Sequence, residues 1–224
     1  MYKINNLKKY NLLEIDLTIA LTAETEIKEN FYEIINFKDQ QIGLLLGDLH
    51  QKKIPEEFRL PLIQGALKTL MKINGHYPLK FMEQARNIIQ NDFHYIENIS
   101  LFYSKLDLHK KELTFINSGL IYPILIRNNQ ARYLRFGEKF NSESDQKFRQ
   151  VIVKLRENDS FLIFTDGLLT VKNKNKMNLG LNNTLKILAD EPQNLINNLE
   201  NFLNNFYDEA NEKNFFSLAL INVK

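Results

Sequence analysis

The stretch Gln41–Glu57, QIGLLLGDLHQKKIPEE, predicts a buried strand that ends at a carboxylate and is followed by a loop and a helix. The apolar run Ile42–Leu46 leads into Gly47-Asp48, and Pro55 with two glutamates opens a helical pattern. The end of a strand just before a helix is a rigid position for an acid at the rim of a sheet. A plain turn built on Gly-Asp is the alternative explanation of the same dipeptide.

A second stretch, Phe161–Gly167 with the sequence FLIFTDG, repeats this pattern. It is again an apolar strand, and it ends at Asp166-Gly167. Two strands that each deliver one aspartate beside a glycine predict two acids that converge on one site. We expect the carboxylates of Asp48 and Asp166 to lie about 4–7 Å apart, as a metal-bridged pair requires.

The overall composition is that of an ordinary globular protein without a strong charge. The 224 residues are 44% hydrophobic, which is ample for a core, and the formal charge of +2 gives no case for nucleic acid or an acidic partner. The chain has no cysteine, which fits a reducing compartment. Its N-terminus lacks the apolar core of a signal peptide, and no apolar run approaches the roughly 18 residues of a membrane span. We therefore expect a cytoplasmic protein that binds neither membrane nor nucleic acid.

The remaining pattern predicts antiparallel strands and two pairs of helices. Leu13–Leu21 alternates strictly between apolar and polar residues, and with Asn30–Phe37 and Gln41–Leu46 it predicts an antiparallel meander. Apolar stripes predict helices over Ile54–Ile73 and Pro78–Asp92. The other predicted strands are Leu101–Leu108, Leu113–Asn117, Ile124–Arg127, Ala131–Leu134, Val151–Leu155, Phe161–Thr165 and Phe215–Val223, and the other helices lie near Leu181–Leu188 and Pro192–Tyr207.

No linker and no repeat divides the chain, so the pattern predicts one α+β domain with two packed sheets and helices outside them. The segment Lys172–Asn178 is rich in lysine and asparagine, and we interpret its charge as that of a solvated loop.

Five short motifs occur along the chain in an order and spacing typical of one enzyme family. They are KENFYE (residues 28–33), GDLHQKKIP (47–55), FINSGL with a following Tyr122-Pro123 (115–123), ND and TDG around an apolar strand (158–167), and NFFSL (214–218). The corresponding family motifs are GGDYYD, GDVSGKGVP, YVNAGH with a following PP, GD with TDG, and DDxTL. From Leu13 to Val223 the chain thus resembles the metal-dependent protein phosphatases (PPM, protein phosphatase 2C-like), in particular the bacterial branch typified by the stage II sporulation protein E phosphatase.

This resemblance implies an α+β fold, namely a four-layer α-β-β-α sandwich of two antiparallel sheets flanked by helices. It implies a single phosphatase-like domain over residues 1–224, with residues 1–12 as an N-terminal extension. It also implies hydrolysis of phosphoserine and phosphothreonine with the help of two Mn²⁺ or Mg²⁺ ions. Transferred to this chain, the catalytic and metal-binding acids are Asp48 and Asp166, and the Leu49 carbonyl is a further metal ligand.

The metal site that the resemblance implies is degenerate in this sequence. Two of its expected carboxylates are asparagine, at Asn30 and Asn214, and each keeps a carbonyl oxygen but loses a negative charge. Gln51 and Lys53 replace both glycines of the loop beside the site, where glycine allows close approach of the backbone. We therefore expect weak or absent binding of Mn²⁺ or Mg²⁺.

Other departures and the nearby acids support the same expectation. Leu120 stands in place of a polar histidine, and Thr170 stands where the family often has glutamate. Glu29 is a poor substitute for Asn30, because a shift of one residue along a strand points the side chain to the opposite face. Glu212 is displaced along the chain from Asn214 and could compensate only through rearrangement of its loop.

Two functional hypotheses follow from the resemblance. In the first, the chain is a regulatory, protein-binding pseudophosphatase of bacterial partner-switching signalling, and its partner is a regulatory protein such as a phosphorylated anti-sigma antagonist or a sensor protein. In the second, it is a weakly active Mn²⁺- or Mg²⁺-dependent protein phosphatase for phosphoserine and phosphothreonine, which uses Asp48 and Asp166. We favour the first, and homo-oligomerisation stays open in both.

Overall fold

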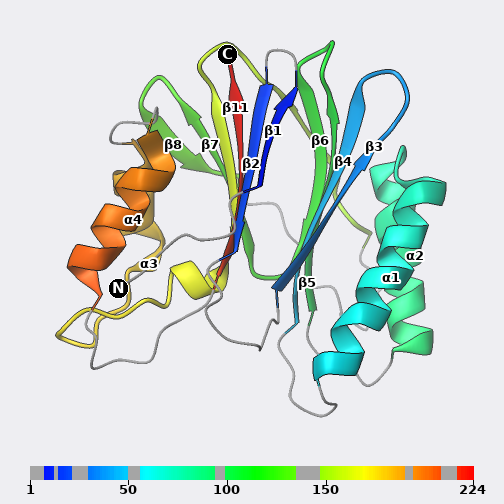
Figure 1. Ribbon diagram of the computed structural model, residues 1–224, viewed down its shortest axis with the longest axis horizontal. Helices are drawn as coiled ribbons and strands as arrows, with labels where there is room; N and C mark the ends of the chain where they lie inside the picture. The colour runs from blue at the N-terminus through cyan, green and yellow to red at the C-terminus, as the bar shows by residue number, and fades with distance from the viewer. Residues whose placement is uncertain are drawn as a thin grey trace. The chain divides into compact units, whose positions relative to one another are not determined.

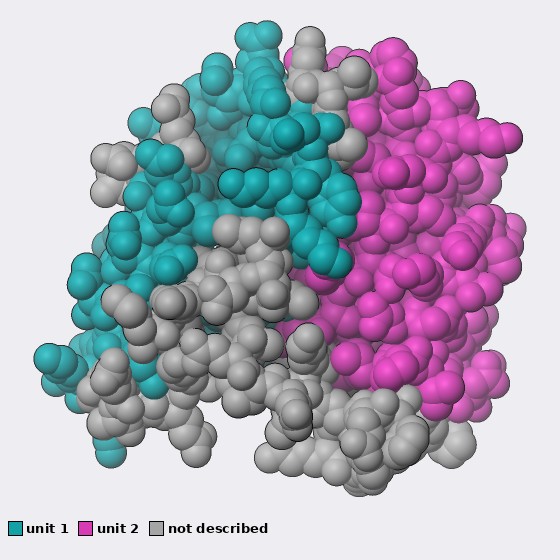
Figure 2. Space-filling model, in the orientation of Figure 1, with its two compact units in different colours: residues 1–24, 122–135, 156–224 teal, residues 25–121, 136–155 magenta. Residues whose placement is uncertain are grey.

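The structure is a computed structural model that describes residues 8–12, 15–21, 30–49, 56–93, 99–134, 147–189, 194–207 and 216–224. These residues form antiparallel strands and helices (Figure 1). They fall into two compact units that interleave along the chain (Figure 2). The first unit comprises residues 1–24, 122–135 and 156–224, and the second comprises residues 25–121 and 136–155. Each unit contains one sheet and one pair of helices.

The first unit is built on a six-stranded antiparallel sheet with the strand order β1-β2-β11-β10-β7-β8. Its strands are β1 (Lys8–Leu12), β2 (Ile15–Leu21), β7 (Ile121–Arg127), β8 (Gln130–Tyr133), β10 (Ser160–Thr165) and β11 (Ser217–Val223), and its helices are α3 (Gly180–Ala189) and α4 (Leu195–Phe206). A short 3-10 turn, η1 (Asp166–Leu168), follows β10.

Helix α4 packs against this sheet through one apolar edge. Leu195, Leu199 and Leu203 recur every four residues, so they lie on one face of the helix, and all three are buried. They join one core cluster with Leu162 of β10 and Leu220 of β11. Burial of each such leucine contributes about 1.5–3 kcal/mol, which exceeds what helix propensity alone supplies over this asparagine-rich segment.

A buried ion pair connects two turns of the first unit. Asp159 is 2% exposed, and its two carboxylate oxygens accept hydrogen bonds from Arg127 Nε at 2.8 Å and Arg127 Nη2 at 2.5 Å. The same carboxylate accepts the backbone N–H of Arg156 at 2.8 Å. Hydrogen bonding to Asp159 raises the pKa of Arg127, against the opposing effect of burial. This pair therefore fixes the turn that precedes β10.

We predict that Asp159→Asn lowers the free energy of unfolding by about 3 kcal/mol, because it leaves Arg127 without its charged partner in a partly buried site. Glu157→Gln is the matched control, since it removes the same charge from an exposed position of the same turn, and it should change stability by less than about 0.5 kcal/mol. Urea unfolding midpoints of the two variants and of the unchanged protein measure the difference. Equal midpoints for both variants would contradict the structural role of the ion pair.

The second unit is built on a five-stranded antiparallel sheet with the order β3-β4-β5-β6-β9. Its strands are β3 (Asn30–Asn36), β4 (Gln41–Leu49), β5 (Ile99–Asp107), β6 (Glu112–Ser118) and β9 (Val151–Lys154), and its helices are α1 (Glu56–Asn74) and α2 (Pro78–Asp92). Both helices lie along one face of this sheet (Figure 1).

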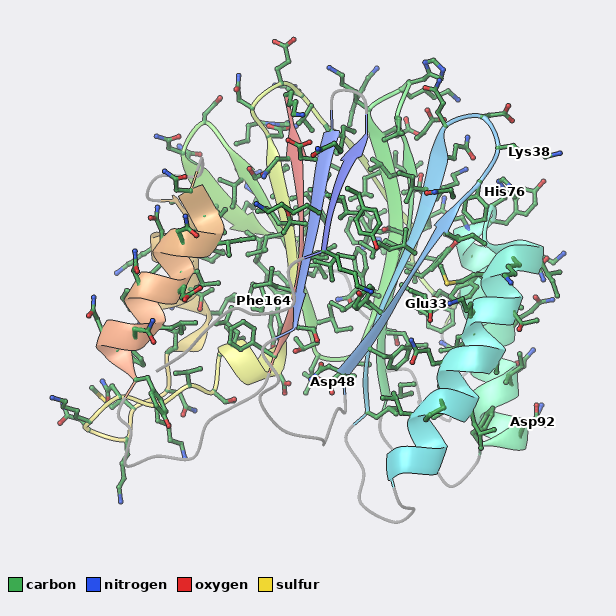
Figure 3. All side chains as sticks on the ribbon, in the orientation of Figure 1. Glu33, Lys38, Asp48, His76, Asp92 and Phe164 are labelled. Carbon is green, nitrogen blue, oxygen red and sulfur yellow. The ribbon has the colours of Figure 1, made fainter. Side chains whose placement is uncertain are left out.

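Alternation along β4 decides which side chains meet the helices. Leu45 and Leu49 belong to the core cluster that contains residues of α1 and α2. Leu44, Leu46 and Asp48 alternate with them, so these three side chains lie on the face opposite to the helices. On the helix side, Glu33 of β3 accepts a hydrogen bond from Gln64 and forms an ion pair with Lys68, which ties β3 to α1 (Figure 3).

The structure confirms the predicted α+β class, the two antiparallel sheets and the helices that accompany each sheet. The antiparallel meander is wrong at its first strand. β3 and β4 do pair, but β2 pairs with β1 and β11 in the other sheet. Alternation predicts a half-buried strand but does not name its partner, and β11 comes from the far end of the chain. β1, which is polar and forms the edge of its sheet, was not predicted as a strand.

Some predictions fall on parts of the chain outside the described residues. The first residues of the predicted strand Leu13–Leu21 and of the helix Ile54–Ile73 are among them, as are Phe215 and the beginning of the helix predicted from Pro192. Within the described part, no helix is long and apolar enough to cross a membrane.

Candidate functional site

Asp48 lies at the end of β4, as the sequence predicted, and it is only 4% exposed (Figure 3). In the antiparallel register it lies opposite Asn30 of β3 on one side and Ser100 of β5 on the other. Residues directly opposite each other point to the same face of a sheet, so the three side chains form a polar row across three strands. The row lies on the face opposite to α1 and α2, where the neighbouring positions of β4 are leucines.

Asn30 is the immediate cross-strand neighbour of Asp48. Cβ atoms at such positions are about 4.5–5.5 Å apart, which brings an amide oxygen within reach of an ion held by the facing carboxylate. The Oδ1 atom of Asn30 is buried and has no hydrogen-bond partner within the described part of the chain. A buried carbonyl oxygen without a partner costs about 1–3 kcal/mol, so this position favours an additional donor or a cation.

The polar row continues from Ser100 to the loop between β6 and β7. Ser100 is buried, and its Oγ atom accepts the backbone N–H of Leu120 at 2.8 Å. Gly119 has φ +95°, and a Cβ atom there would lie 2.4 Å from Ser100 Oγ and 2.9 Å from Ser100 Cα. Only glycine fits both this backbone angle and this approach. Leu120, which replaces a histidine of the family motif, is 49% exposed.

Packing explains why glycine occupies position 47 and leucine occupies position 49, on either side of Asp48. The aromatic ring of Phe31 covers Gly47, because a Cβ atom at position 47 would lie 2.1–2.8 Å from ring carbons of its register partner. The side chain of Leu49 is buried in the core beneath α1 and α2. The role of the Leu49 carbonyl as a metal ligand stays a prediction.

Asp166 begins the 3-10 turn η1 directly after β10, in the first unit. The preceding Thr165 is buried, and its Oγ1 atom accepts the backbone N–H of Ser217 at 3.1 Å, which joins the end of β10 to the start of β11. The hydroxyl of Tyr122, in β7, lies close enough to the Asp166 carboxylate to interact with it electrostatically. Burial raises the pKa of the Tyr122 hydroxyl, and Tyr133 and the Asp166 carboxylate raise it further.

The structure thus brings together Asn30 and Asp48, which face each other within the second unit. Asp166 belongs to the first unit, so the expected separation of about 4–7 Å between Asp48 and Asp166 stays a prediction. Asn214, Gln51, Lys53, Glu29 and Glu212 lie outside the described residues. Thr170 is exposed and donates a hydrogen bond from its hydroxyl to the Gly167 carbonyl at 3.1 Å, as a residue of a short helical turn does.

Sequence reasoning missed Ser100 and named Tyr122 only as part of a motif. A signal for Ser100 was present, because it is a polar residue at the start of the apolar run ISLFY, but its position beside Asp48 requires the pairing of β4 with β5. Tyr122 occupies the first position of the Tyr-Pro pair that corresponds to a Pro-Pro pair of the family.

The donor atoms at the end of β4 suit one hard cation. Mg²⁺ and Mn²⁺ prefer oxygen ligands, and Asp48 supplies a carboxylate while Asn30 supplies a buried amide oxygen. Among the described residues, no group of three histidine, cysteine or acidic side chains gathers in a way that could hold a metal. The described part of the site therefore offers oxygen atoms of the right kind with a single carboxylate charge.

Comparison with known proteins agrees with this fold. The profile of the family described as Stage II sporulation protein E (SpoIIE) matches residues 38–216, so the chain belongs to this family of PPM-type phosphatase domains. No curated protein matches the chain by sequence at a significant level.

Three solved structures show the similarity of fold. The PP2C domain of SiaA from Pseudomonas aeruginosa has a TM-score of 0.79 at 14% identity and covers 93% of this chain and 85% of that one. RsbX in complex with magnesium has a TM-score of 0.70 at 13% identity, over 97% and 100% of the two chains. The PP2C phosphatase domain of SpoIIE from Bacillus subtilis, with a fragment of its regulatory domain, has a TM-score of 0.74 at 12% identity, over 96% and 64%. At such identities the likeness establishes the fold.

Proposed function

We propose that this chain is a regulatory, protein-binding member of the SpoIIE family, a pseudophosphatase of partner-switching signalling. The observation that supports this proposal most directly is the pair formed by Asn30 and Asp48. The position that faces the buried aspartate is an amide instead of a second carboxylate. Asn214 makes the same change in sequence at the second of the two family acid positions that this chain has lost.

The loss of negative charge at these positions weakens metal binding, although each asparagine keeps a carbonyl oxygen. At a separation of a few ångströms in a partly buried site, one negative charge beside a divalent cation contributes on the order of several kcal/mol before solvation. Two missing charges make it difficult to hold two cations close together, because their mutual repulsion is no longer offset. A phosphatase fold with this defect keeps its surface for protein recognition while its hydrolytic step becomes slow or absent.

The alternative function is that of a weakly active Mn²⁺- or Mg²⁺-dependent phosphatase for phosphoserine and phosphothreonine. One observation favours it, since the buried Asn30 oxygen is an acceptor that a cation could use together with Asp48. When bound, a metal pair lowers the pKa of a water and stabilises the displacement at phosphorus. In this alternative Asp48, the Leu49 carbonyl and Asp166 hold the ions, and Asn30 supplies a neutral oxygen.

Calorimetric titration with Mn²⁺ separates the two functions. We predict a dissociation constant in the millimolar range or no detectable heat, because the charge that binds a hard cation is reduced. Asp48→Asn is the control, since it removes the remaining carboxylate of this strand end and should abolish any residual binding. Micromolar binding of two ions by the unchanged protein would overturn the pseudophosphatase proposal and support the weakly active enzyme.

The partner in this proposal is a regulatory protein, such as a phosphorylated anti-sigma antagonist or a sensor protein, and the location is the cytoplasm. Support comes from the relatives: SpoIIE is described as a cell fate determinant, and its solved structure joins the phosphatase domain to a fragment of a regulatory domain. Co-purification of the tagged chain with the regulator, in a form that depends on the regulator's phosphorylation, would test this part directly.

A further inference from the structure

The segment between η1 and α3 forms a compact hairpin that the proposed metal site does not use. We define the lysine hairpin as Val171–Leu179, with the sequence VKNKNKMNL (Figure 1). Val171 and Leu179 are both buried, and they close the hairpin through a hydrogen bond from Leu179 N–H to the Val171 carbonyl at 2.8 Å. The residues between them are largely exposed, including all three lysines and Met177, which is 56% exposed.

Hydrogen bonds hold the tip of the lysine hairpin in one conformation. The side-chain Oδ1 of Asn173 accepts the backbone N–H of Asn175 at 2.9 Å and that of Met177 at 3.0 Å. Two backbone hydrogen bonds cross the same turn, from Asn173 N–H to the Met177 carbonyl and from Lys176 N–H to the Asn173 carbonyl. A loop ordered in this way loses little conformational entropy when it binds.

Within the sequence of the lysine hairpin and of helix α3, every charged residue is positive. From Gly167 to Ala189 the chain contains Lys172, Lys174, Lys176 and Lys186 and no acidic residue. The formal charge of +2 for the whole chain therefore hides a strongly uneven distribution. This positive segment begins directly after Asp166, the residue of the first unit that the family resemblance places in the metal site.

The backbone of Lys176 adopts a conformation that is unusual for lysine. Its φ is 59°, in the left-handed region that glycine and asparagine tolerate much better than lysine does. A turn selected only for its shape would be easier to build with one of those residues. Lys176→Gly therefore separates the charge of this lysine from the shape of the turn.

We propose that the lysine hairpin is a docking site for an acidic segment of the protein partner. This inference rests on the proposed function for the kind of partner, which is a protein. The lysines fit carboxylates, the exposed side chains of Asn175 and Asn178 fit a peptide backbone, and Met177 fits an apolar side chain between the acids. Single-stranded nucleic acid is a poorer fit, because it is usually bound with aromatic side chains or arginine, and the hairpin contains neither.

The test uses a fluorescein-labelled peptide of four Glu-Ser-Leu repeats and the full chain in metal-free buffer of low ionic strength. Binding is measured by fluorescence anisotropy. The triple substitution Lys172→Gln, Lys174→Gln, Lys176→Gln should weaken binding about tenfold or more, because three favourable charges are removed from one rigid surface. The matched control Lys80→Gln, Lys147→Gln, Lys154→Gln removes three exposed lysines of the second unit and should weaken binding less than about twofold.

Two single substitutions separate the role of the rigid conformation from that of charge. Asn173→Ala keeps every lysine but removes the acceptor that orders the tip, so we expect about threefold weaker binding with an unchanged salt dependence. Lys176→Gly relieves the left-handed position, so the thermal midpoint should not fall while the affinity falls about threefold. A structural role alone would instead lower the thermal midpoint.

Three results would overturn the proposal. The first is an equal loss of peptide affinity in the two triple variants. The second is no binding of the peptide by the unchanged protein at low ionic strength. The third is binding of a single-stranded oligonucleotide of equal charge as tightly as the peptide. Asp48→Asn should bind the peptide normally. The assay contains no metal, so a failure of the peptide to bind would not affect the proposal for the metal site. Strong binding of Mn²⁺ in the calorimetric titration would likewise not affect the docking result.

Discussion

Replacing Asn30 and Asn214 by aspartate should turn a protein with near-background phosphatase activity into one with Mn²⁺-dependent turnover of an aryl phosphate, an increase of roughly 100-fold or more. Asparagine and aspartate are nearly isosteric, so the double substitution restores charge without adding bulk. Asn30→Asp places its new carboxylate directly opposite Asp48 in the register of β3 and β4. A further Asp48→Asn substitution should abolish the acquired activity, which assigns it to this site.

Asn30→Asp by itself should also change the free energy of unfolding. Without metal, Asn30→Asp sets two like charges opposite each other, so the free energy of unfolding should fall by about 0.5–1 kcal/mol. Mn²⁺ should reverse this loss, because the cation binds the folded state. Thermal unfolding with and without Mn²⁺ measures both effects. If activity does not appear, Gln51→Gly and Lys53→Gly should be added, since both glycines of the family loop are missing.

Robust Mn²⁺-dependent turnover by the unchanged protein, lost on Asp48→Asn, would contradict the pseudophosphatase proposal. It would establish instead that the buried amide oxygen of Asn30 is an adequate ligand. This outcome and the calorimetric titration test the same claim by independent measurements.

Gly119→Ala should be the most damaging small substitution in the described part of the site, with a loss of about 3 kcal/mol or more in the free energy of unfolding. The new methyl group would lie 2.4 Å from Ser100 Oγ and 2.9 Å from Ser100 Cα, at a φ of +95° that alanine disfavours. The contact includes backbone, so the loop cannot give way by moving only a flexible side chain. Urea unfolding measures the loss.

Gly65→Ala is the matched control for this substitution. A Cβ atom at Gly65 would meet nothing within 4 Å among the described residues, and the position is an exposed one within α1. Alanine is the better helix former, so we expect Gly65→Ala to raise the free energy of unfolding by about 0.5–1 kcal/mol. Opposite signs for the two glycines would confirm that the loss comes from the backbone angle of Gly119 and its contact with Ser100, and equal signs would contradict it.

Local patterns predicted the elements that depend on neighbouring residues. The apolar run and Gly47-Asp48 placed Asp48 at a strand end, and the short turn after Asn36 kept β3 and β4 together as a pair. Helix α2 begins at Pro78 as predicted, because proline has a backbone angle suited to the first turn. These features depend on interactions over a few residues, and the sequence contains the signals for them.

The elements that depend on distant residues could not be predicted in the same way. β2 pairs with β11, and Ile15 lies opposite Val223, near the other end of the chain. The polar edge strand β1 shows no alternation of apolar and polar residues, and it forms a strand because it pairs with β2. The prediction of a meander failed for this reason: a strand's apolar face specifies that it needs a partner, but not which one.

For the candidate site, the strand-end pattern predicted Asp48 and Asp166, and the family resemblance added Asn30 and Asn214; carboxylates bind hard cations and amides bind them less strongly. The tertiary structure decided which of these residues meet. It placed Asn30 across from Asp48, added Ser100 through a pairing of β4 with β5 that spans two helices, and ordered the lysine hairpin through Asn173. Sequence determines charge and hydrogen-bonding capacity, whereas proximity arises only when hydrogen bonds between strands and packing of the core fix the register.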